Sequence, residues 1–330
     1  MTFKYDNVYI KNTTTVAGPY EKKGPLKKYF DKTFDDLYFN ESSFEKAEIK
    51  TVKESLKLLY KKAGLKKKEV DVILGGDLLN QISATTYGAY GYSKSFLGLY
   101  GACSTSVEGM ILGSSLIDAK KVKNAVVTIS SHNMAAEKQF RNPTEYGAPK
   151  PLSATFTATG SASVLLTEEK TDIKVESSTI GQIIDLDQND PNDMGKVMAP
   201  AAIDTLKRHL QDLNRKVDYY DLIVTGDLGL YGKEIVKDYM QEEYNIDLSK
   251  NYNDCGIMLY DLKKQEECLA GGSGPVCSAL VSLGYIYHEM KQKKLKRVLI
   301  IATGALFSPT MVYQKENIYS IANAISLEVV

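Results

Sequence analysis

The sequence predicts an α/β fold in which two duplicated β-α-β-α-β halves stack into five layers, α-β-α-β-α. Three observations predict it: the chain repeats itself without a gap, apolar strand-like runs alternate with helical patterns, and each half contains a helix of small residues. Alternating strands and helices are typical of a mainly parallel sheet that is covered on both faces. The two halves span residues 1–169 and 170–330.

The clearest repeat joins residues 51–77, TVKESLKLLYKKAGLKKKEVDVILGGD, to residues 201–227, AAIDTLKRHLQDLNRKVDYYDLIVTGD. Each copy has the apolar spacing of an amphipathic helix, followed by a basic loop and an apolar strand suited to a buried sheet. Gly64 aligns with Asn214, and both residue types tolerate the left-handed conformation that ends a helix.

The remaining segments fall into the same order in both halves. NVYIKNTTTVAG near the start resembles TDIKVESSTIGQI from residue 171, and each predicts a first strand. KNAVVTISS at 123–131 resembles KRVLIIATG at 296–304, an apolar strand after a lysine-rich turn. Between them, GACSTSVEGMILGSSL resembles AGGSGPVCSALVSLGY, and both predict a helix buried between two sheets. Small residues in the first of these helices permit close packing: Gly109, Gly113, Ser114 and Ser115.

The composition is that of a folded protein without a strong electrostatic preference. The chain has 330 residues, 43% hydrophobic and 25% charged, with 41 Lys and Arg against 41 Asp and Glu. No net field selects nucleic acid or an anionic membrane. The lysine runs at 66–68 and 291–297 are typical of solvated surface beside helix ends.

The four cysteines follow no CxxC or zinc spacing, which indicates a reducing compartment. The N-terminal stretch MTFKYDNVYI lacks the apolar region of a signal peptide. No run approaches the roughly 18 to 20 apolar residues of a membrane span. We therefore expect any work at a membrane to be peripheral.

The stretch GACSTSVEG places Cys103 at the start of a predicted helix. The free N–H groups and the dipole of a helix N-terminus stabilise a thiolate, so Cys103 is a candidate nucleophile. A cysteine among small residues can equally be a buried packing residue. Packing is the expected role of the other three cysteines, Cys255, Cys268 and Cys277.

With its duplicated halves and its cysteine at the start of a central helix, the chain resembles the thiolase superfamily, which includes the ketoacyl synthases. GACSTSVEGM resembles the nucleophile segment of that superfamily, and FTATGSASVLLTE (156–168) resembles its Gly-rich strand closing the first half. The resemblance covers essentially the whole chain. It implies the five-layer thiolase-like fold and a homodimer.

Longer segments are similar to a family of sporulation proteins within this superfamily, found in spore-forming bacteria. They are SSHNMAAEKQFRNPTEYGAPKPLSATFTATGSAS, NYNDCGIMLYD, AGGSG and TGALFSPT. The resemblance implies binding of dipicolinic acid (pyridine-2,6-dicarboxylate) and support of its uptake into the developing spore. The implied partners are membrane proteins of the same sporulation operon, and the implied location is the forespore or spore, peripherally at the inner membrane.

The catalytic set of the superfamily is incomplete in this sequence. Acyl transfer needs a histidine beside the cysteine and a second His or Asn that completes the oxyanion hole. The superfamily places the first after the strand that here reads DLIVTGD, where this chain has Asp227, and the second in the loop GGSGP, which has neither. An ionised aspartate cannot donate a hydrogen bond to an oxyanion, and it would raise the pKa of a nearby thiol.

We therefore expect a non-catalytic binding protein. The alternative is an active thiolase or ketoacyl-synthase-type acyltransferase that uses Cys103. A third reading is an interaction scaffold with a vestigial site, which recruits membrane partners through lysine-rich faces. His132 follows an apolar strand and could approach the site, whereas His209 and His288 are expected in packing or surface positions. Asp227 could also be a turn or capping residue, because Asp77 ends the matching strand of the first half.

Dipicolinate is a flat aromatic dianion, which needs N–H donors or cations and an apolar surface. Two helix N-termini, at 101–105 and 271–276, are expected to point at one cavity. Asp227 would repel the ligand unless a water bridges them, one carboxyl is protonated, or a calcium ion is shared. No other cofactor is expected. The candidate ligand-binding residues are Cys103, Ser104, Thr105, His132, Asp227, Gly272, Ser273 and Gly274, with Lys138, Arg141 and Lys150 as added charge or as a solvated loop.

Overall fold

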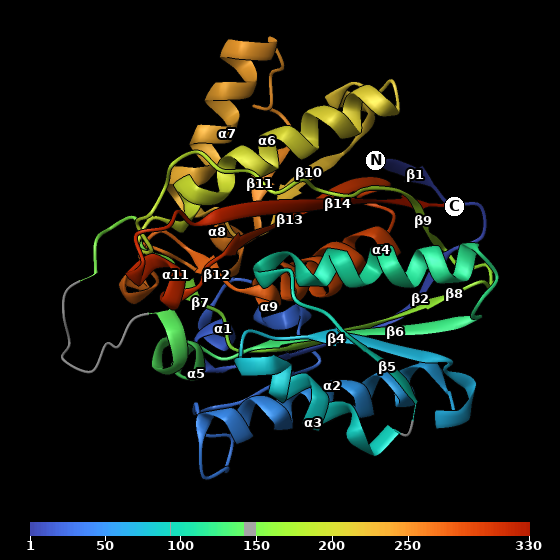
Figure 1. Ribbon diagram of the computed structural model, residues 1–330. Coiled ribbons are helices and arrows are strands. Elements are labelled where there is room, and N and C mark those ends of the chain that lie inside the picture. Colours follow the sequence, from blue (N-terminus) through green and yellow to red (C-terminus); the bar gives the residue numbers. More distant parts are fainter. Residues whose placement is uncertain (93, 142–149) are drawn as a thin grey trace.

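The computed structural model describes residues 1–92, 94–141 and 150–330 of the chain (Figure 1). Its strands form one large sheet whose two parts have the same strand order. The first part runs β5-β4-β6-β8-β2 and the second β11-β10-β13-β14-β9. They are continuous where Tyr9 of β2 pairs with Lys174 of β9. The matching order confirms the duplication.

The strands of the first part are β2 (Tyr9–Ala17), β4 (Val72–Gly76), β5 (Ser95–Gly98), β6 (Asn124–Ser131) and β8 (Gly160–Thr167), with β1 (Thr2–Lys4) and β3 (Lys32–Thr33) beside them. Those of the second part are β9 (Ile173–Thr179), β10 (Leu222–Thr225), β11 (Tyr252–Asp254), β13 (Arg297–Leu306) and β14 (Tyr319–Val329). A separate pair, β7 (Phe156–Thr157) and β12 (Gly272–Ser273), joins the two halves.

The expectation of a mainly parallel sheet is wrong. In each half one strand, β4 or β10, pairs in parallel with both of its neighbours, but β8 and β14 run antiparallel to both of theirs. A parallel return needs a crossover helix that packs on the sheet. The α-helices described in the connections to β8 and β14 are α5 (Asn133–Ala136) and α11 (Pro309–Tyr313), which are single short turns. The chain therefore reverses direction there, and the sheet is mixed.

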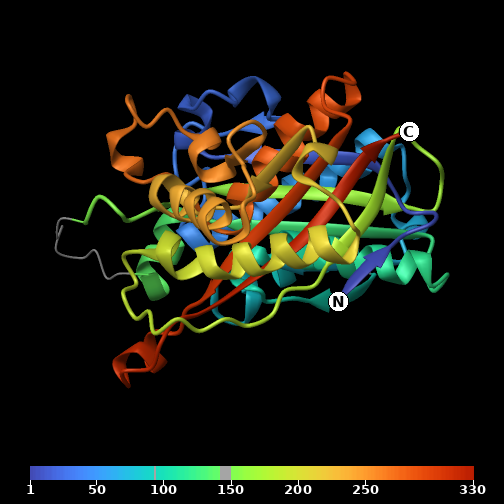
Figure 2. The same ribbon diagram turned by 90° about the horizontal axis from the view of Figure 1, so that it is seen from above.

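The helices form the three helical layers that the duplication predicts (Figures 1 and 2). One outer layer holds α2 (Phe44–Ala63) and α3 (Ser83–Ala89), and the other holds α6 (Met194–Asp212) and α7 (Gly229–Tyr244). Between the two parts of the large sheet lie α4 (Thr105–Asp118) and α9 (Pro275–Leu280), the latter continued by a π-helical turn (Val281–Ile286) and α10 (Tyr287–Lys291). Among the helices of the described residues, none is both long and apolar enough to cross a bilayer.

The shorter helices are α1 (Pro19–Lys23) and α8 (Cys255–Leu259), the 3-10 turns η1 (Lys27–Tyr29), η2 (Lys67–Glu69), η3 (Asn80–Ile82), η4 (Tyr90–Tyr92), η5 (Ala102–Ser104), η8 (Val217–Tyr219) and η9 (Glu266–Cys268), and a π-helical turn (Glu137–Arg141). The predicted left-handed helix ends are confirmed. Gly64 has φ 64° after α2, and Asn214 has φ 51° after α6.

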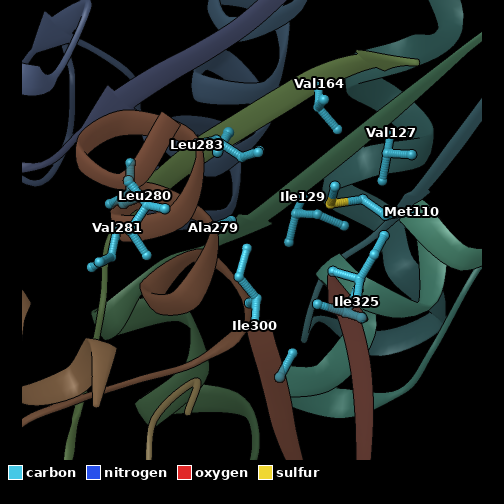
Figure 3. Close-up of a cluster of buried hydrophobic side chains, with 14 of the residues drawn as sticks. Met110, Val127, Ile129, Val164, Ala279, Leu280, Val281, Leu283, Ile300 and Ile325 are labelled. Atoms are coloured by element: carbon cyan, nitrogen blue, oxygen red, sulfur yellow. The ribbon is translucent and has the colours of Figure 1, made fainter. Parts of the chain in front are cut away.

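The largest hydrophobic cluster fills the central layer between the two parts of the large sheet (Figure 3). Met110 of α4 and Leu280 of α9 meet the inward-facing residues Ile129, Ile300 and Ile325 of three strands. The central helices also touch through a hydroxyl pair, Ser106 and Ser278, at 3.0 Å. The predicted small residues Gly109 and Gly113 instead let α4 pack closely on the strands, since a Cβ atom there would lie 2.6 Å from Val127 and 2.9 Å from Leu166.

Candidate functional site

A tight turn in front of α4 presents Cys103. Ala102 has φ 49°, a left-handed conformation that is uncommon for a residue with a side chain. The Ser104 hydroxyl donates to the carbonyl of Gly101 at 2.7 Å, and the Thr105 hydroxyl donates to that of Ala102 at 2.6 Å. Both hydroxyls, predicted to bind ligand, are buried and close this turn instead. Cys103 is the partly exposed residue of the three.

Cys103 opens onto a small cavity of about 30 Å³ between the two halves. By volume this is room for about one or two water molecules. The surface is mostly apolar, with hydroxyl groups from Tyr100, Thr157 and Ser273. The described lining residues are Leu78, Tyr100, Ala102, Cys103, Thr157, Met194, Met198, Ser273, Ala305 and Phe307.

Asp227 lies directly behind this lining and is 1% exposed. Its carboxylate accepts hydrogen bonds from the Gly274 N–H at 3.0 Å, the Ser273 hydroxyl at 3.3 Å and the Thr303 hydroxyl at 2.7 Å. Gly274 can offer its N–H in this way because it has φ 95°, a conformation open to glycine. The donors of the GGSG loop that we expected to hold a ligand carboxylate thus hold the carboxylate of Asp227.

The two duplicated aspartates have different roles. Asp77 is a turn and capping residue, since its carboxylate accepts from the N–H groups of Leu79 at 2.9 Å and Thr85 at 2.7 Å. In the second half Asp254 has the equivalent capping role. Its carboxylate accepts hydrogen bonds from the backbone N–H groups of Leu228 and Gly229 at the start of α7. Burial, with the nearby charge of Asp227, raises the pKa of Asp254 to about 7. Asp227 is therefore available to reach across to the loop before α9.

His132 does not belong to the described lining of the cavity. Its Nε2 atom lies 2.8 Å from the carbonyl oxygen of Leu37, and its ring packs against Phe39 and Phe44. Burial lowers the pKa of His132 to about 4, so the imidazole is neutral near pH 7. The strand repeat pairs His132 with Ala305, which does line the cavity.

The same alignment of the two halves accounts for the space beside Met194 and Met198. Phe44 aligns with Met194, and Glu48 aligns with Met198. In the first half the rings of Phe44 and His132 pack together, with the buried Glu48 bonded to Ser130. In the second half Ala305 replaces the imidazole and leaves space beside the two methionines. Sequence reasoning missed Met194, Met198 and Ala305, although this alignment was the signal that could have found them.

The other two histidines lie elsewhere, and all three belong to the described chain. His209 is buried, 2.8 Å from the Thr179 hydroxyl and 2.7 Å from that of Tyr220. His288 contacts the ring of Tyr29. The described lining therefore offers no imidazole that could take a proton from Cys103, and it contains no Asn, Lys or Arg.

The predicted added charges are used in ion pairs. Lys138 pairs with Glu45 at 3.0 Å, and Lys150 pairs with Glu137 at 3.0 Å. The side chain of Arg141 lies outside the described part of the structure.

The other cysteines have the packing role that the sequence predicts. Cys255, Cys268 and Cys277 are buried in the central hydrophobic cluster. Burial raises the pKa of each of the three thiols. Gly272 packs so closely on Cys277 that a Cβ atom there would lie 2.9 Å from its sulfur. Gly272 therefore shapes the core and does not line the cavity.

The contacts of Asp227 bear on whether it could share a calcium ion with a ligand. Calcium takes 6–8 oxygen ligands, whereas the Asp227 oxygens accept three hydrogen bonds from donors. Within the described residues, no group of three or more acidic, Cys or His side chains could hold a metal ion.

Comparison with known proteins places this geometry in context. Residues 1–328 match the family model described as Stage V sporulation protein AD (SpoVAD). The protein of that name from Bacillus subtilis (strain 168) is 44% identical over 321 residues, 97% of this chain and 94% of that protein. These matches confirm the predicted resemblance to the sporulation family.

Solved structures support the fold. Cerulenin-bound OleA from Xanthomonas campestris is 13% identical, with 99% of this chain and 98% of that chain covered and a TM-score of 0.62. The 3-oxoacyl-[acyl-carrier-protein] synthase III from Aquifex aeolicus VF5 is 13% identical, with 97% and 99% covered and a TM-score of 0.58. At such identities the likeness shows the thiolase-like fold alone, which confirms the predicted fold class.

Proposed function

The chain belongs to the stage V sporulation protein AD family, and we propose that it serves sporulation by binding dipicolinic acid without catalysing acyl transfer. The observation that carries the non-catalytic part is the composition of the Cys103 pocket. Its described lining supplies neither the histidine nor the asparagine that acyl transfer needs, and Asp227 stands behind it at the position of the first partner. Dipicolinate as the ligand rests on the family resemblance.

The pocket suits the chemistry of a flat aromatic diacid once it opens. The ring would lie against the apolar lining, and its carboxylates would face the hydroxyls of Thr157 and Ser273 and the N-terminus of α4. Because the cavity of about 30 Å³ is smaller than a pyridine dicarboxylate, lining side chains must move for the ligand to enter. Met194 and Met198 are flexible enough to do so, since methionine adapts to irregular spaces.

Ligand binding is proposed to need no calcium shared with Asp227, because three donors already engage its carboxylate. Titration of the purified protein with dipicolinate, with and without calcium, tests this. Equal affinity is expected. A large gain with calcium that Asp227→Asn removes would overturn it.

The oligomeric state, the location and the partners are proposed from the resemblance to the family. We propose a homodimer that associates peripherally with the inner membrane of the spore and cooperates with membrane proteins of the same operon. Gel filtration with light scattering tests the dimer, and fractionation of forespore membranes tests the location. A monomer in solution, or a protein wholly absent from the membrane fraction, would contradict these two points.

Thiol chemistry separates binding from the enzymatic alternative. Iodoacetamide near neutral pH should label Cys103 no faster than an ordinary thiol, and incubation with an acyl-CoA should transfer no acyl group to it. Rapid selective labelling of Cys103 together with acyl transfer would identify an acyltransferase instead. Cys103→Ala is the control for site assignment.

A further inference from the structure

The outer helix of the first half carries a row of lysines on its solvent side, which we call the lysine face: Lys46, Lys50, Lys53, Lys57 and Lys61 of α2. Their spacing of four, three, four and four residues keeps all five within about 80° around the helix. They lie opposite the buried side of α2, which includes Val52, Leu56 and Leu59. The row extends about 22 Å along the helix axis.

The positive charge of the lysine face belongs to a half of the chain that is basic, while the other half is acidic. Residues 1–169 carry 23 Lys and Arg against 18 Asp and Glu, whereas residues 170–330 carry 18 against 23. The overall neutrality therefore hides a basic half and an acidic half. The three lysine residues at 66–68, directly after α2, add to the same outer layer.

Within the described part of the chain, three lysines of the face, Lys53, Lys57 and Lys61, form no close ion pair, although the charge of Lys57 does act on Glu54. Among the ion pairs of the described residues, none involves Lys53, Lys57 or Lys61, and all three are exposed. The nearest acidic residue of the helix, Glu54, pairs with Lys32 at 2.8 Å. Like charges three or four residues apart destabilise a helix. Repulsion between these lysines therefore opposes the stability of the helix.

The duplication supplies an internal comparison. Helix α6 occupies the matching outer layer with the same topology, and the counterparts of the five lysines there are Lys196, Pro200, Ile203, Lys207 and Gln211. Two of the five are lysine. The fold is thus built without a lysine face in one of its two halves.

The neighbouring helix adds aromatic side chains. Helix α3 lies beside α2 in the same outer layer (Figure 1), and Tyr87 and Tyr90 at its end are 66% and 87% exposed. Lys67 lies over the ring of Tyr92 at 4.8 Å, which joins the basic loop to this edge. Lysine with exposed tyrosine is typical of surfaces that meet lipid headgroups, where the aromatic ring sits at the interface.

We infer that the lysine face binds an anionic lipid surface and sets which side of the protein faces the membrane. The face contains five lysines and no arginine, and lysine acts as a flexible point charge, whereas arginine suits the planar, bidentate recognition of one defined group. A diffuse negative surface is therefore the partner that fits it best. The inference rests on the part of the proposed function that places the protein at a membrane, and it is independent of dipicolinate binding.

Co-sedimentation of the full chain with lipid vesicles tests this. The probes are vesicles of phosphatidylcholine alone and vesicles of phosphatidylcholine mixed with phosphatidylglycerol. The protein should sediment with the mixed vesicles at low salt and be released at high salt, because exposed charges are screened. The variant K53E/K57E/K61E should lose about hundredfold or more in affinity, since each lysine contributes about fivefold near an anionic surface.

A matched control keeps the same change in net charge. K216E/K250E/K293E alters three exposed lysines of the second half and should retain binding within a few-fold. The neutral triple K53Q/K57Q/K61Q guards against an effect of charge reversal on folding and should show an intermediate loss. Far-UV circular dichroism and dipicolinate titration check each variant. If circular dichroism and dipicolinate binding are normal but the protein does not bind the anionic vesicles, the lipid inference is wrong, whereas the proposed binding of dipicolinate is unaffected.

Three results would overturn the inference. They are equal binding to both kinds of vesicle, equal losses in the two triple Lys→Glu variants, or binding to polyglutamate without binding to phosphatidylglycerol vesicles. The last would make the face a docking surface for an acidic protein.

Discussion

The Asp227 carboxylate accepts a 3.0 Å hydrogen bond from the backbone N–H of Gly274, the residue immediately before α9. This contact joins the end of a strand in the second half to the loop whose donors would otherwise face a ligand or an oxyanion. A negative side chain fixed in this way cannot act as an oxyanion donor. The same bond makes Asp227 a structural element of the pocket wall.

Asp227→Asn should lower the free energy of unfolding by about 1–3 kcal/mol, because an amide cannot accept from all three donors and its own NH₂ would face them. Urea unfolding monitored by circular dichroism measures this. Asp218→Asn, at an exposed carboxylate, is the control and should be nearly neutral. Equal stability of the Asp227 variant and the wild type would show that the contact is not structural.

Gly274→Ala should destabilise the protein by about 1–3 kcal/mol. An alanine at φ 95° is strained, and its Cβ would lie 3.0 Å from the Ser131 hydroxyl oxygen. Thermal unfolding of this variant is compared with that of Gly91→Ala, whose added methyl group meets nothing within 4 Å. Similar midpoints for the two variants would contradict the assigned role of Gly274.

His209→Gln should change how stability depends on pH. Burial lowers the pKa of His209 from 6.5 to about 4, so the unfolded chain takes up a proton at higher pH than the folded one. The stabilisation that depends on the neutral ring is fully present above pH 6.5 and is lost as the pH falls towards 4. Over this window the advantage of the wild type over the variant should shrink, by at most about 3 kcal/mol.

Urea unfolding at several pH values between 4 and 7 checks this difference. His288→Gln, at an exposed ring, should leave the profile of the wild type unchanged. Parallel profiles for the wild type and His209→Gln would show that the buried imidazole does not contribute in this way.

Most of the fold could be predicted because it follows local patterns. The amphipathic helix, the left-handed stop at Gly64 or Asn214 and the apolar strand are each encoded within a short segment and then repeated. The direction of β8 and β14 could not be predicted in this way, since it depends on what the connection before each strand contains.

The candidate site was predicted in part, because its geometry depends on contacts between distant segments. The sequence placed Cys103 and Ser273 at one cavity, and the structure brings them together there. Ser104 and Thr105 were predicted to bind the ligand, but their hydroxyls form hydrogen bonds that close a turn. The packing of His132 in the first half was not predicted either, nor was the cavity lining formed by its counterpart Ala305.

Isothermal calorimetry with dipicolinate tests the central claim most directly. The wild type should bind, and Cys103→Ala should bind with less than about a tenfold change, because the sulfur has no proposed contact with the carboxylates. Ala305→Leu, which fills the cavity, should lose binding while keeping its secondary structure, and Ala119→Leu, at an exposed position, should bind as the wild type does. The account predicts this order of affinities. Absence of binding by the wild type, or unchanged binding by Ala305→Leu, would contradict it.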